Sequence, residues 1–525
     1  TNVWLSNGSY GYRDYALSHY KKIGEKFGYA ISGDYRNSDG YFTNLFTDKK
    51  ADDMKSGSAR IRLEWKPQKN LSFGLMSSFD RSVQGGYPYA VCDSVTHKPG
   101  EVDYNDYSFY KRTLSTTGFS ADYQGTGNSR TAFQYLSDHQ GIDQDFSPRS
   151  IYFARQDMKQ KMFSEELNIK STTPGRYKWL FGAFGFWQGI DNTVTLDYFT
   201  KDYATRKLYD TPAYGVAFYH QSTIDDLLTR GLSLTFGIRY DYEHTSNDFL
   251  FYKETDGGSE QMDAFDSRLK FSQVTPKIAL QYMFPSTGML YATVTKGYKT
   301  GGFNTSFDRE EDRTFRPETS WNYELGAKHP FLDNRLNAEF CFFWIDWKNQ
   351  QIYQMLATQN GQYLRNAGRS ESKGVEVSLQ GNPVNGLMVQ VNYGFTHATF
   401  KDYKDERRGI DYSGNFLPMV PRHTFAVGAD YTIPNPCRHI DRFTVSANYT
   451  GTGRILWKED NKVSQPYYGL LNAKVSATKD FITFAIWAKN MTGADYSAFY
   501  FETGGKGLAQ KGRPFTIGGN IQLSF

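Results

Sequence analysis

The last eleven residues constrain the fold of this chain most strongly. From Phe515 to Phe525 every odd position is apolar or glycine, and every even position is Thr, Gly, Asn, Gln or Ser. Successive side chains of a β-strand point to opposite faces, so this segment has one apolar face and one polar face. The pattern therefore predicts an amphipathic strand that runs to the end of the chain.

The same alternation recurs along the chain, at 232–243, 387–396, 443–450 and 59–65. In the segment 59–65, Arg60, Arg62 and Glu64 occupy every second position. A soluble β-sandwich could not bury a face that carries so much charge, whereas a water-filled lumen holds one readily. The recurrence predicts an all-β transmembrane barrel with an apolar outside and a polar inside.

The composition agrees with a barrel and disfavours other classes. The chain has 39 tyrosines and 40 phenylalanines, yet its mean hydropathy is −0.62. Barrels need aromatic side chains at both membrane interfaces while their lumen and loops stay polar. No apolar run approaches the ~18 residues of a membrane helix, and a net charge of +4 gives no support for a nucleic-acid partner. The chain starts without a signal peptide, which suggests that it begins inside a larger precursor.

Short and long connections alternate between the predicted strands. Ten short turns are rich in Gly, Pro, Asn and Asp, as tight turns require; they fall at 23–26, 67–70, 125–128, 173–176, 225–231, 285–288, 332–335, 382–386, 434–441 and 478–480. Eleven mostly longer polar stretches lie between them, at 7–12, 39–55, 85–106, 140–159, 190–212, 246–266, 301–314, 351–365, 403–416, 452–464 and 494–511. These 21 connections predict 22 antiparallel strands, with the short turns periplasmic and the long loops extracellular.

The three cysteines, Cys92, Cys341 and Cys437, fall in an outer loop, a strand and a periplasmic turn of this topology. They are too far apart to bridge one another across a membrane, so we expect all three to be unpaired. Among the charged strand residues, Glu324, Lys328 and Glu376 are expected to face the lumen.

Several motifs resemble those of TonB-dependent outer-membrane receptors. The segment 295–304, TKGYKTGGFN, is similar to a strand end of these receptors, and 315–328, FRPETSWNYELGAK, is similar to the strand that follows it. Further matches are Gly374–Val377, Pro418–Pro421 with the adjoining Arg-His, Asn490–Tyr496, Ser38–Tyr41 and the final strand that ends in Phe525. The resemblance covers the chain from the first strands to the last residue.

The resemblance implies energised import of a scarce, bulky nutrient, most often a ferric siderophore or a similar metal chelate. It also implies several partners: a plug domain inside the barrel, a TonB energy-transducing complex, outer-membrane lipid and a small chelate ligand, with a surface lipoprotein as a further candidate. We expect residues 1–525 to form the barrel domain alone, with the plug outside this sequence. Haem, cobalamin or oligosaccharide import within the same family, and a passive channel when unplugged, remain alternatives. The haem-type Asn-Pro-x-Leu element does not occur in the sequence.

No enzyme motif is present: the sequence lacks G-x-S-x-G, H-E-x-x-H, a P-loop and G-x-G-x-x-G. We therefore expect no catalytic residues, no protein-bound metal and no cofactor. Aromatic and arginine side chains near the outer loops are the candidates for binding a flat, anionic chelate. The alternative for each of them is a place in the aromatic girdle or a solvated loop. The candidates are Tyr87, Tyr89, Trp187, Tyr298, Lys299, Phe303, Asn304, Arg309, Arg313, Tyr353, Arg365, Trp457, Tyr496, Phe499 and Tyr500.

Overall fold

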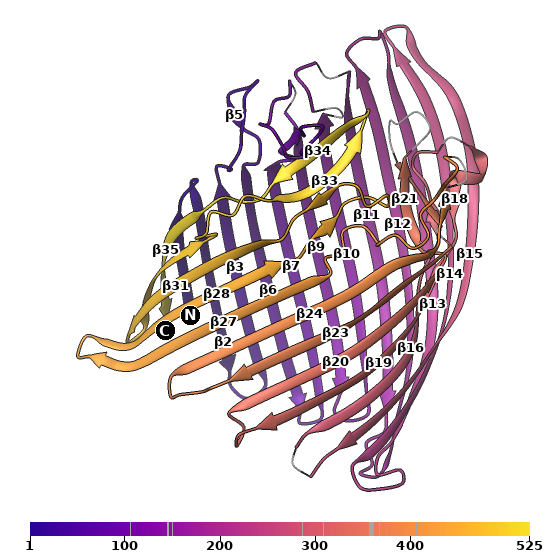
Figure 1. Ribbon diagram of the computed structural model, residues 1–525. Helices are drawn as coiled ribbons and strands as arrows, with labels where there is room; N and C mark the ends of the chain where they lie inside the picture. The colour runs from indigo at the N-terminus through magenta and orange to yellow at the C-terminus, as the bar shows by residue number, and fades with distance from the viewer. Residues whose placement is uncertain are drawn as a thin grey trace.

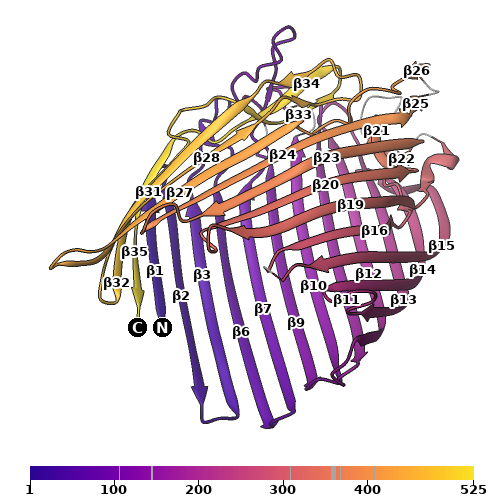
Figure 2. The same ribbon diagram turned by 60° about the horizontal axis from the view of Figure 1, so that its bottom comes forward.

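The structure, a computed structural model, describes the whole chain except residues 106, 144–145, 150, 286, 308, 356–361, 367 and 406–407. Its main element is a closed antiparallel barrel of 22 strands, in which each strand pairs with the next one and the last pairs with the first. Figure 1 shows this wall, and Figure 2 shows that the two chain ends lie side by side. The predicted fold class and strand number are confirmed.

The barrel strands are short near the two termini and long in the middle of the chain. They are β1 (Asn2–Gly8), β2 (Tyr12–Ile23), β3 (Phe27–Ser38), β6 (Met54–Gln68), β7 (Leu71–Gly85), β9 (Phe109–Tyr123), β10 (Gly127–Asp143), β11 (Tyr152–Lys170), β12 (Tyr177–Tyr198), β13 (Ala204–Ile224), β14 (Leu232–Thr255), β15 (Gly258–Met283), β16 (Met289–Lys299), β19 (Glu318–Phe331), β20 (Leu336–Lys348), β23 (Arg369–Gly381), β24 (Leu387–Asp402), β27 (His423–Cys437), β28 (Ile440–Thr452), β31 (Tyr468–Lys479), β32 (Ile482–Lys489) and β35 (Thr516–Ser524).

The outer loops contain short strands of their own. These are β4 (Thr43–Asn44), β5 (Lys49–Lys50), β8 (Tyr89–Val91), β17 (Gly302–Phe303), β18 (Thr314–Phe315), β21 (Gln351–Met355), β22 (Gln362–Asn366), β25 (Lys404–Asp405), β26 (Ile410–Asp411), β29 (Ile455–Leu456), β30 (Ser464–Gln465), β33 (Ser497–Thr503) and β34 (Lys506–Lys511), together with the 3-10 helix η1 (Glu310–Arg313). Among the described residues, no helix is both long and apolar enough to cross a bilayer.

Strand β35 closes the barrel against β1. The register runs from Asn2 opposite Ser524 to Gly8 opposite Gly518. The amide of Phe525 donates to the carbonyl of Thr1 at 2.8 Å, so the pairing extends to the chain ends. The seam is tight, because a Cβ on Gly518 would lie 2.4 Å from the carbonyl oxygen of Asn7 in β1. Glycine at this position therefore lets the first and last barrel strands approach each other.

The apolar and polar faces predicted for the terminal strand are the outer and inner faces of the barrel wall. Ile517 and Ile521 are 47% and 42% exposed on the outside, whereas Thr516 and Asn520 are buried on the inside. The same division appears in β19, where Leu325 is 57% exposed and the neighbouring Glu324 lines a polar hollow. In a barrel the apolar face contacts lipid, so the exposed hydrophobic side chains take the place of a conventional core.

The predicted short turns are confirmed. The connections 225–231, 332–335 and 382–386 have the predicted bounds, and the others differ by a few residues. In the turn after β19, Leu332, Asp333 and Asn334 all have positive φ, between 53° and 66°. Such left-handed runs reverse the chain within very few residues, which explains why Asp and Asn mark the turn in the sequence.

Three of the predicted long loops are wrong. The stretches 140–159, 190–212 and 246–266 are largely strand, because β10 and β11 continue for 17 and 19 residues and β12 to β15 for 22, 21, 24 and 26 residues. These strands rise well beyond the membrane-facing part of the wall, as Figure 1 shows at its right side. Both faces of the upper sheet lack lipid contact, so the sequence there loses its clear alternation and resembles a polar loop. We call this upper part of β12–β15 the tall wall.

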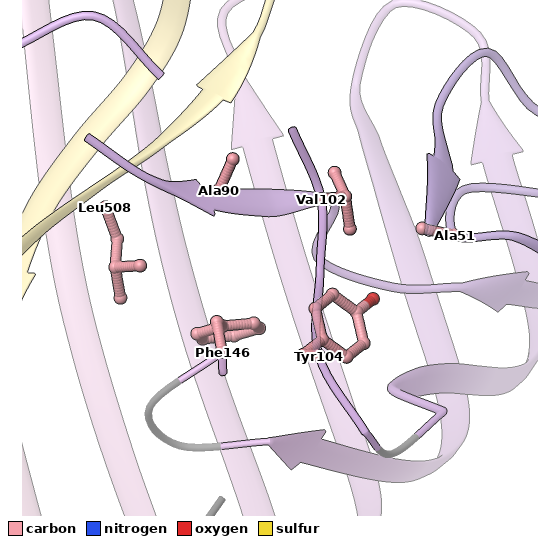
Figure 3. Packing of buried hydrophobic residues seen from close by; sticks show 6 residues of the cluster. All are labelled: Ala51, Ala90, Val102, Tyr104, Phe146 and Leu508. Atoms are coloured by element: carbon pink, nitrogen blue, oxygen red, sulfur yellow. The ribbon is translucent and has the colours of Figure 1, made fainter. Parts of the chain in front are cut away.

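The other outer loops fold over the barrel mouth as small cores. One cluster combines Ala51, Ala90, Val102, Tyr104, Phe146 and Leu508, and Figure 3 shows these side chains converging from separate loops. Above it, β8 joins the β33–β34 hairpin as a three-stranded sheet, although the sequences are more than 400 residues apart. All three cysteines are free, as predicted.

Candidate functional site

A cavity of about 770 Å³ lies between the outer loops that follow β20, β24, β28 and β32. We call it the loop cavity. Its lining includes nine aromatic residues: Trp347, Tyr353, Phe400, Tyr403, Tyr412, Trp457, Phe499, Tyr500 and Phe501. This size is in the range of pockets for drug-sized molecules.

Two buried clusters hold the loops that form the loop cavity. On one side Phe400, at 0% exposure, packs with Tyr403 and Tyr412. On the other side Trp457 and Tyr500 pack in a second cluster. Because both clusters bury their rings among the loops themselves, the cavity between them has walls that are formed before any ligand arrives.

A hydrogen-bonded glutamine ties the floor of the first cluster to a neighbouring hairpin. The side-chain amide of Gln354 donates to the Tyr403 hydroxyl at 2.5 Å, and the Tyr363 hydroxyl donates to Gln354 Oε1 at 3.2 Å. Gln354 is buried, and it belongs to the β21–β22 hairpin. This hairpin is therefore fixed against the loop after β24, and it presents Tyr353 to the cavity.

Charged groups in the loop cavity largely neutralise each other. Lys458 forms an ion pair with Glu502, and Arg408 lies 3.8 Å from Asp405. Burial raises the pKa of the Glu459 carboxyl above its ordinary value of 4.5, and the nearby Lys458 and Arg408 offset only part of this effect. An aromatic cavity with paired charges favours a flat ligand with hydrogen-bonding groups over a simple ion.

The Glu459→Gln substitution is expected to slow local opening of segment 455–465 at about pH 7.5, with no effect at about pH 4. The folded-state pKa of Glu459 is raised, so a buried charge opposes the folded loop above that pKa. Below the unfolded-state value the group is neutral in both states, and the penalty disappears. Amide hydrogen exchange of this segment at the two pH values measures the effect; equal slowing at both would contradict the role of charge.

The sequence model of the family described as "TonB dependent receptor-like, beta-barrel" matches residues 3–491. The chain belongs to this family. TonB-dependent receptors are outer-membrane proteins, so the barrel lies in the outer membrane, with the short turns on the periplasmic side and the folded loops outside.

Relatives by sequence are distant. The pesticin receptor of Yersinia pestis is 24% identical over 303 residues, which are 57% of this chain and 42% of that protein. The ferric-pyoverdine M114 receptor PbuA of a Pseudomonas strain is 25% identical over 217 residues, 41% of this chain and 24% of that protein. The matched region thus spans less than half the length of these relatives.

Solved structures show the same fold over the entire chain. The ferric yersiniabactin uptake receptor FyuA from Yersinia pestis superposes with a TM-score of 0.86 at 18% identity, covering 100% of this chain and 79% of that one. The siderophore receptor PiuA from Acinetobacter baumannii gives a TM-score of 0.81 at 15% identity, covering 100% and 81%. At such identities the likeness concerns the fold.

In this receptor barrel the loop cavity brings together four of the fifteen predicted residues: Tyr353, Trp457, Phe499 and Tyr500. Tyr353 is 62% exposed, whereas Trp457 and Tyr500 are buried at 7% and 2%. Tyr353 is thus free to meet a ligand, and the buried rings mainly support the wall.

Four other predicted residues belong to the loop between β16 and β19 of the receptor. Phe303 pairs with Thr314 in a short hairpin. Arg309 and Arg313 are neutralised by acidic groups of the same loop, and the Arg313 guanidinium also lies 4.0 Å from the centre of the Phe265 ring. This loop therefore packs against the inner face of the tall wall.

Asn304, the fourth of them, ties two loops together. Its side-chain amide donates to the carbonyls of Asp312 and Leu364 at 2.8 and 2.9 Å, and its Oδ1 accepts from the Leu364 amide at 2.7 Å. It is 6% exposed. Asn304 thus fixes the β17–β18 loop to the β21–β22 hairpin, and its position is that of a structural residue.

The Asn304→Ala substitution is expected to cost about 1–3 kcal/mol of local stability, because it leaves buried backbone groups without partners. Hydrogen exchange should accelerate both in 302–315 and in 362–366, although only the first segment contains the mutation. Asn461, which bonds Phe416 instead, offers the comparison: Asn461→Ala should accelerate exchange near 416 and leave 362–366 unchanged. Acceleration limited to 302–315 in Asn304→Ala would contradict the tie.

The remaining predicted residues lie at scattered places around the mouth. Tyr87 donates to Gln140 at 2.7 Å and stacks with Tyr89, which supports the cluster in Figure 3. Tyr496 stacks on Tyr468 at 4.2 Å. Three more occupy strand positions: Tyr298 and Lys299 end β16, and Arg365 pairs with Ile352.

Trp187 lies on the outer surface of the barrel wall, away from the space that the outer loops enclose. The prediction that it belongs to the ligand site is therefore corrected. It lies in β12 on the same face as the exposed Phe181, directly opposite Phe163 of β11, and is 46% exposed. The inner face of β12 carries polar groups instead, such as Gln188, which bonds Gln160. Trp187 therefore occupies the lipid-facing girdle, where an indole is stable at the membrane interface.

Sequence reasoning missed a group of cationic and aromatic side chains on the inner face of the tall wall. Lys201 lies 4.4 Å from the ring centre of Tyr198, and Lys253 lies 4.8 Å from that of Tyr203. Lys207, below them, faces the ring of Phe251 at 5.5 Å. The inward positions of β13, such as Thr205, Lys207 and Tyr209, recur with a period of two, and this spacing is the signal in the sequence that points to strand.

The lumen wall below is polar, as predicted. Glu324, Lys328 and Glu376 line one hollow of about 870 Å³ together with Glu339. The Lys328 amine donates to Glu339 at 2.8 Å. Within the described residues, no group of three or more His, Cys, Asp or Glu side chains is arranged to hold a metal ion.

Proposed function

We propose that the protein imports a ferric siderophore, or a similar metal chelate, through the outer membrane. The observation that carries the proposal is the preformed aromatic cavity of the outer loops above the polar lumen of a TonB-dependent receptor barrel. The names of the relatives support it, since these proteins are described as receptors for pesticin, ferric pyoverdine and ferric yersiniabactin. The metal is cargo and arrives inside the chelate.

The proposal includes two partners outside these 525 residues. A plug domain fills the lumen, and charged wall residues such as Glu324, Lys328 and Glu339 offer it hydrogen bonds and ion pairs. A TonB complex supplies the energy that moves the plug. The chain itself provides the binding vestibule and the conduit, and no covalent chemistry is part of its task.

The cavity also discriminates among the alternatives. An aromatic lining binds ring-bearing chelates by stacking, whereas an oligosaccharide needs more unpaired hydrogen-bonding groups than the paired charges here provide. A passive channel has no need of a preformed cavity above its mouth. The experiment is whole-cell binding in the cold, where transport stops. Cells that produce the receptor should retain a ring-bearing ferric chelate in preference to maltotriose, and equal retention of the two would overturn the proposal.

A further inference from the structure

The outer surface of the barrel carries an uneven band of charge just above its lipid-facing aromatic belt. Phe133, Phe163 and Trp187 mark the belt: they are directly paired across β10, β11 and β12, and each is 46–48% exposed. Positions two residues apart on a strand point to the same face, and we call this interval a step. One step covers about 7 Å along the strand, which is roughly 5 Å of height at a typical strand tilt. The band occupies the first three steps above the belt.

One side of the band, on β6 to β11, is basic. Lys161 lies one step above Phe163, and Lys159 lies two steps above it. Arg81 lies two residues beyond the exposed Phe79. It is in the same register row as Lys159, because Arg81 pairs with Thr113, Thr113 with Ser137, and Ser137 with Lys159. Lys55 and Lys111 lie one step higher, on either side of Val83.

These five cations are exposed and available. None of Lys55, Arg81, Lys111, Lys159 and Lys161 takes part in an ion pair with any residue that the structure describes, and all five are classed as exposed. Of the acidic groups nearby, Asp157 pairs with His139 at 2.5 Å and Asp197 pairs with Arg155, whereas Asp191 of β12 stands directly opposite Lys159. The other four cations therefore present unneutralised positive charge.

On β12 to β15 the same register row is acidic, and the exposed Arg268 and Lys270 of β15 lie one and two steps below it. Four aspartates stand in direct cross-strand register on one step: Asp191, Asp210, Asp248 and Asp266. Lys159 continues this step on β11, opposite Asp191. Like charges directly opposite each other repel, so this row also repels anions from the bilayer.

We propose that the basic side, Lys55, Arg81, Lys111, Lys159 and Lys161, is a binding site for the phosphorylated headgroups of outer-leaflet lipid. The heights fit along single strands, because Lys161 and Lys159 stand roughly 5 and 10 Å above Phe163 on β11, and Arg81 stands roughly 5 Å above Phe79 on β7. The charge fits, because each lysine or arginine near a membrane surface attracts an anionic lipid. The acyl chains of the same lipid lie against Phe79, Phe133 and Phe163 directly below. Phosphorylated lipid thus gathers on the β6–β11 side of the receptor.

The test is native mass spectrometry of the full protein released from micelles that contain phosphatidic acid or phosphatidylcholine. Wild type should retain phosphatidic acid, and each single variant, Lys159→Gln or Lys161→Gln, should weaken retention about fivefold. The fourfold variant with Arg81→Gln and Lys111→Gln added should lose it almost entirely. The matched control is the acidic row, Asp191→Asn with Asp248→Asn, which should retain at least as much lipid as wild type.

Each other outcome overturns the proposal. Equal retention of phosphatidylcholine means that the belt binds acyl chains and that the protein does not discriminate between headgroups. Displacement of the lipid by millimolar inorganic phosphate means that the site takes free phosphate. Loss of retention in the acidic variant as large as in the basic one means that the effect is a general change in the barrel surface. Far-ultraviolet circular dichroism confirms that each variant is folded, and the single variants keep the test valid if the fourfold variant is not.

Discussion

The Tyr353→Ala substitution is expected to weaken chelate binding by about 1–2 kcal/mol, or roughly 5- to 30-fold in Kd. Tyr353 is the most exposed of the predicted residues in the loop cavity, at 62%, and it stands on a hairpin fixed by Gln354. Its loss removes a ring from the binding surface without opening a buried cluster. The measurement is whole-cell binding of the ferric chelate in the cold as a function of concentration.

Two variants separate the ring from other effects. Tyr353→Phe keeps the ring and should bind within about twofold of wild type, if stacking carries the contact. Tyr177→Ala removes a similarly exposed tyrosine, 52%, at the opposite end of the barrel and should have no effect. Unchanged binding in Tyr353→Ala would place the ligand outside the loop cavity.

The Leu325→Arg substitution is expected to destabilise the barrel by about 2–4 kcal/mol, the penalty for an arginine on the lipid face near the bilayer centre. Leu325 lies in the middle of β19 and is 57% exposed on the outside. The adjacent Glu324 faces the lumen, so Glu324→Arg places the same side chain on the wet face. That variant should change the free energy of unfolding by less than about 1 kcal/mol.

Denaturant titration of both variants in lipid vesicles, followed by tryptophan fluorescence, measures the difference. The two mutations are one residue apart in the same strand, so strand propensity and depth in the membrane are nearly matched. Similar destabilisation by both would show that the faces of β19 are not divided between lipid and water, and would contradict the alternation on which the fold rests.

The strand pattern of the membrane part was predictable because lipid and lumen impose opposite demands on successive residues. The terminal strand shows this, since Ile517 and Ile521 face out while Thr516 and Asn520 face in. Tight turns were predictable too, because positive φ at Asp333 and Asn334 selects characteristic residues. Above the membrane these demands end, and the strands of the tall wall therefore resembled loops.

The sequence predicted which residue types form the candidate site, but it predicted only in part which positions form it. Aromatic residues in the outer loops were identified, but the sequence does not show which rings pack into loop cores. Tyr500 and Trp457 support the walls, Tyr353 faces the cavity, and Trp187 lies in the girdle. Those distinctions depend on contacts between loops that are distant in the chain, such as β8 with β34. The outward charge band was equally hidden, since it depends on the register of adjacent strands.

Energised import of a ferric chelate is the function proposed for this receptor. The direct measurement is the accumulation of radioactive iron, supplied as a ring-bearing ferric chelate, in cells that produce the protein, with and without a protonophore. Accumulation should require the receptor, should fall to the background of receptor-free cells when the proton gradient is removed, and should be reduced in Tyr353→Ala at low chelate concentration. Receptor-dependent accumulation that is unchanged by the protonophore would contradict it and would identify a passive channel.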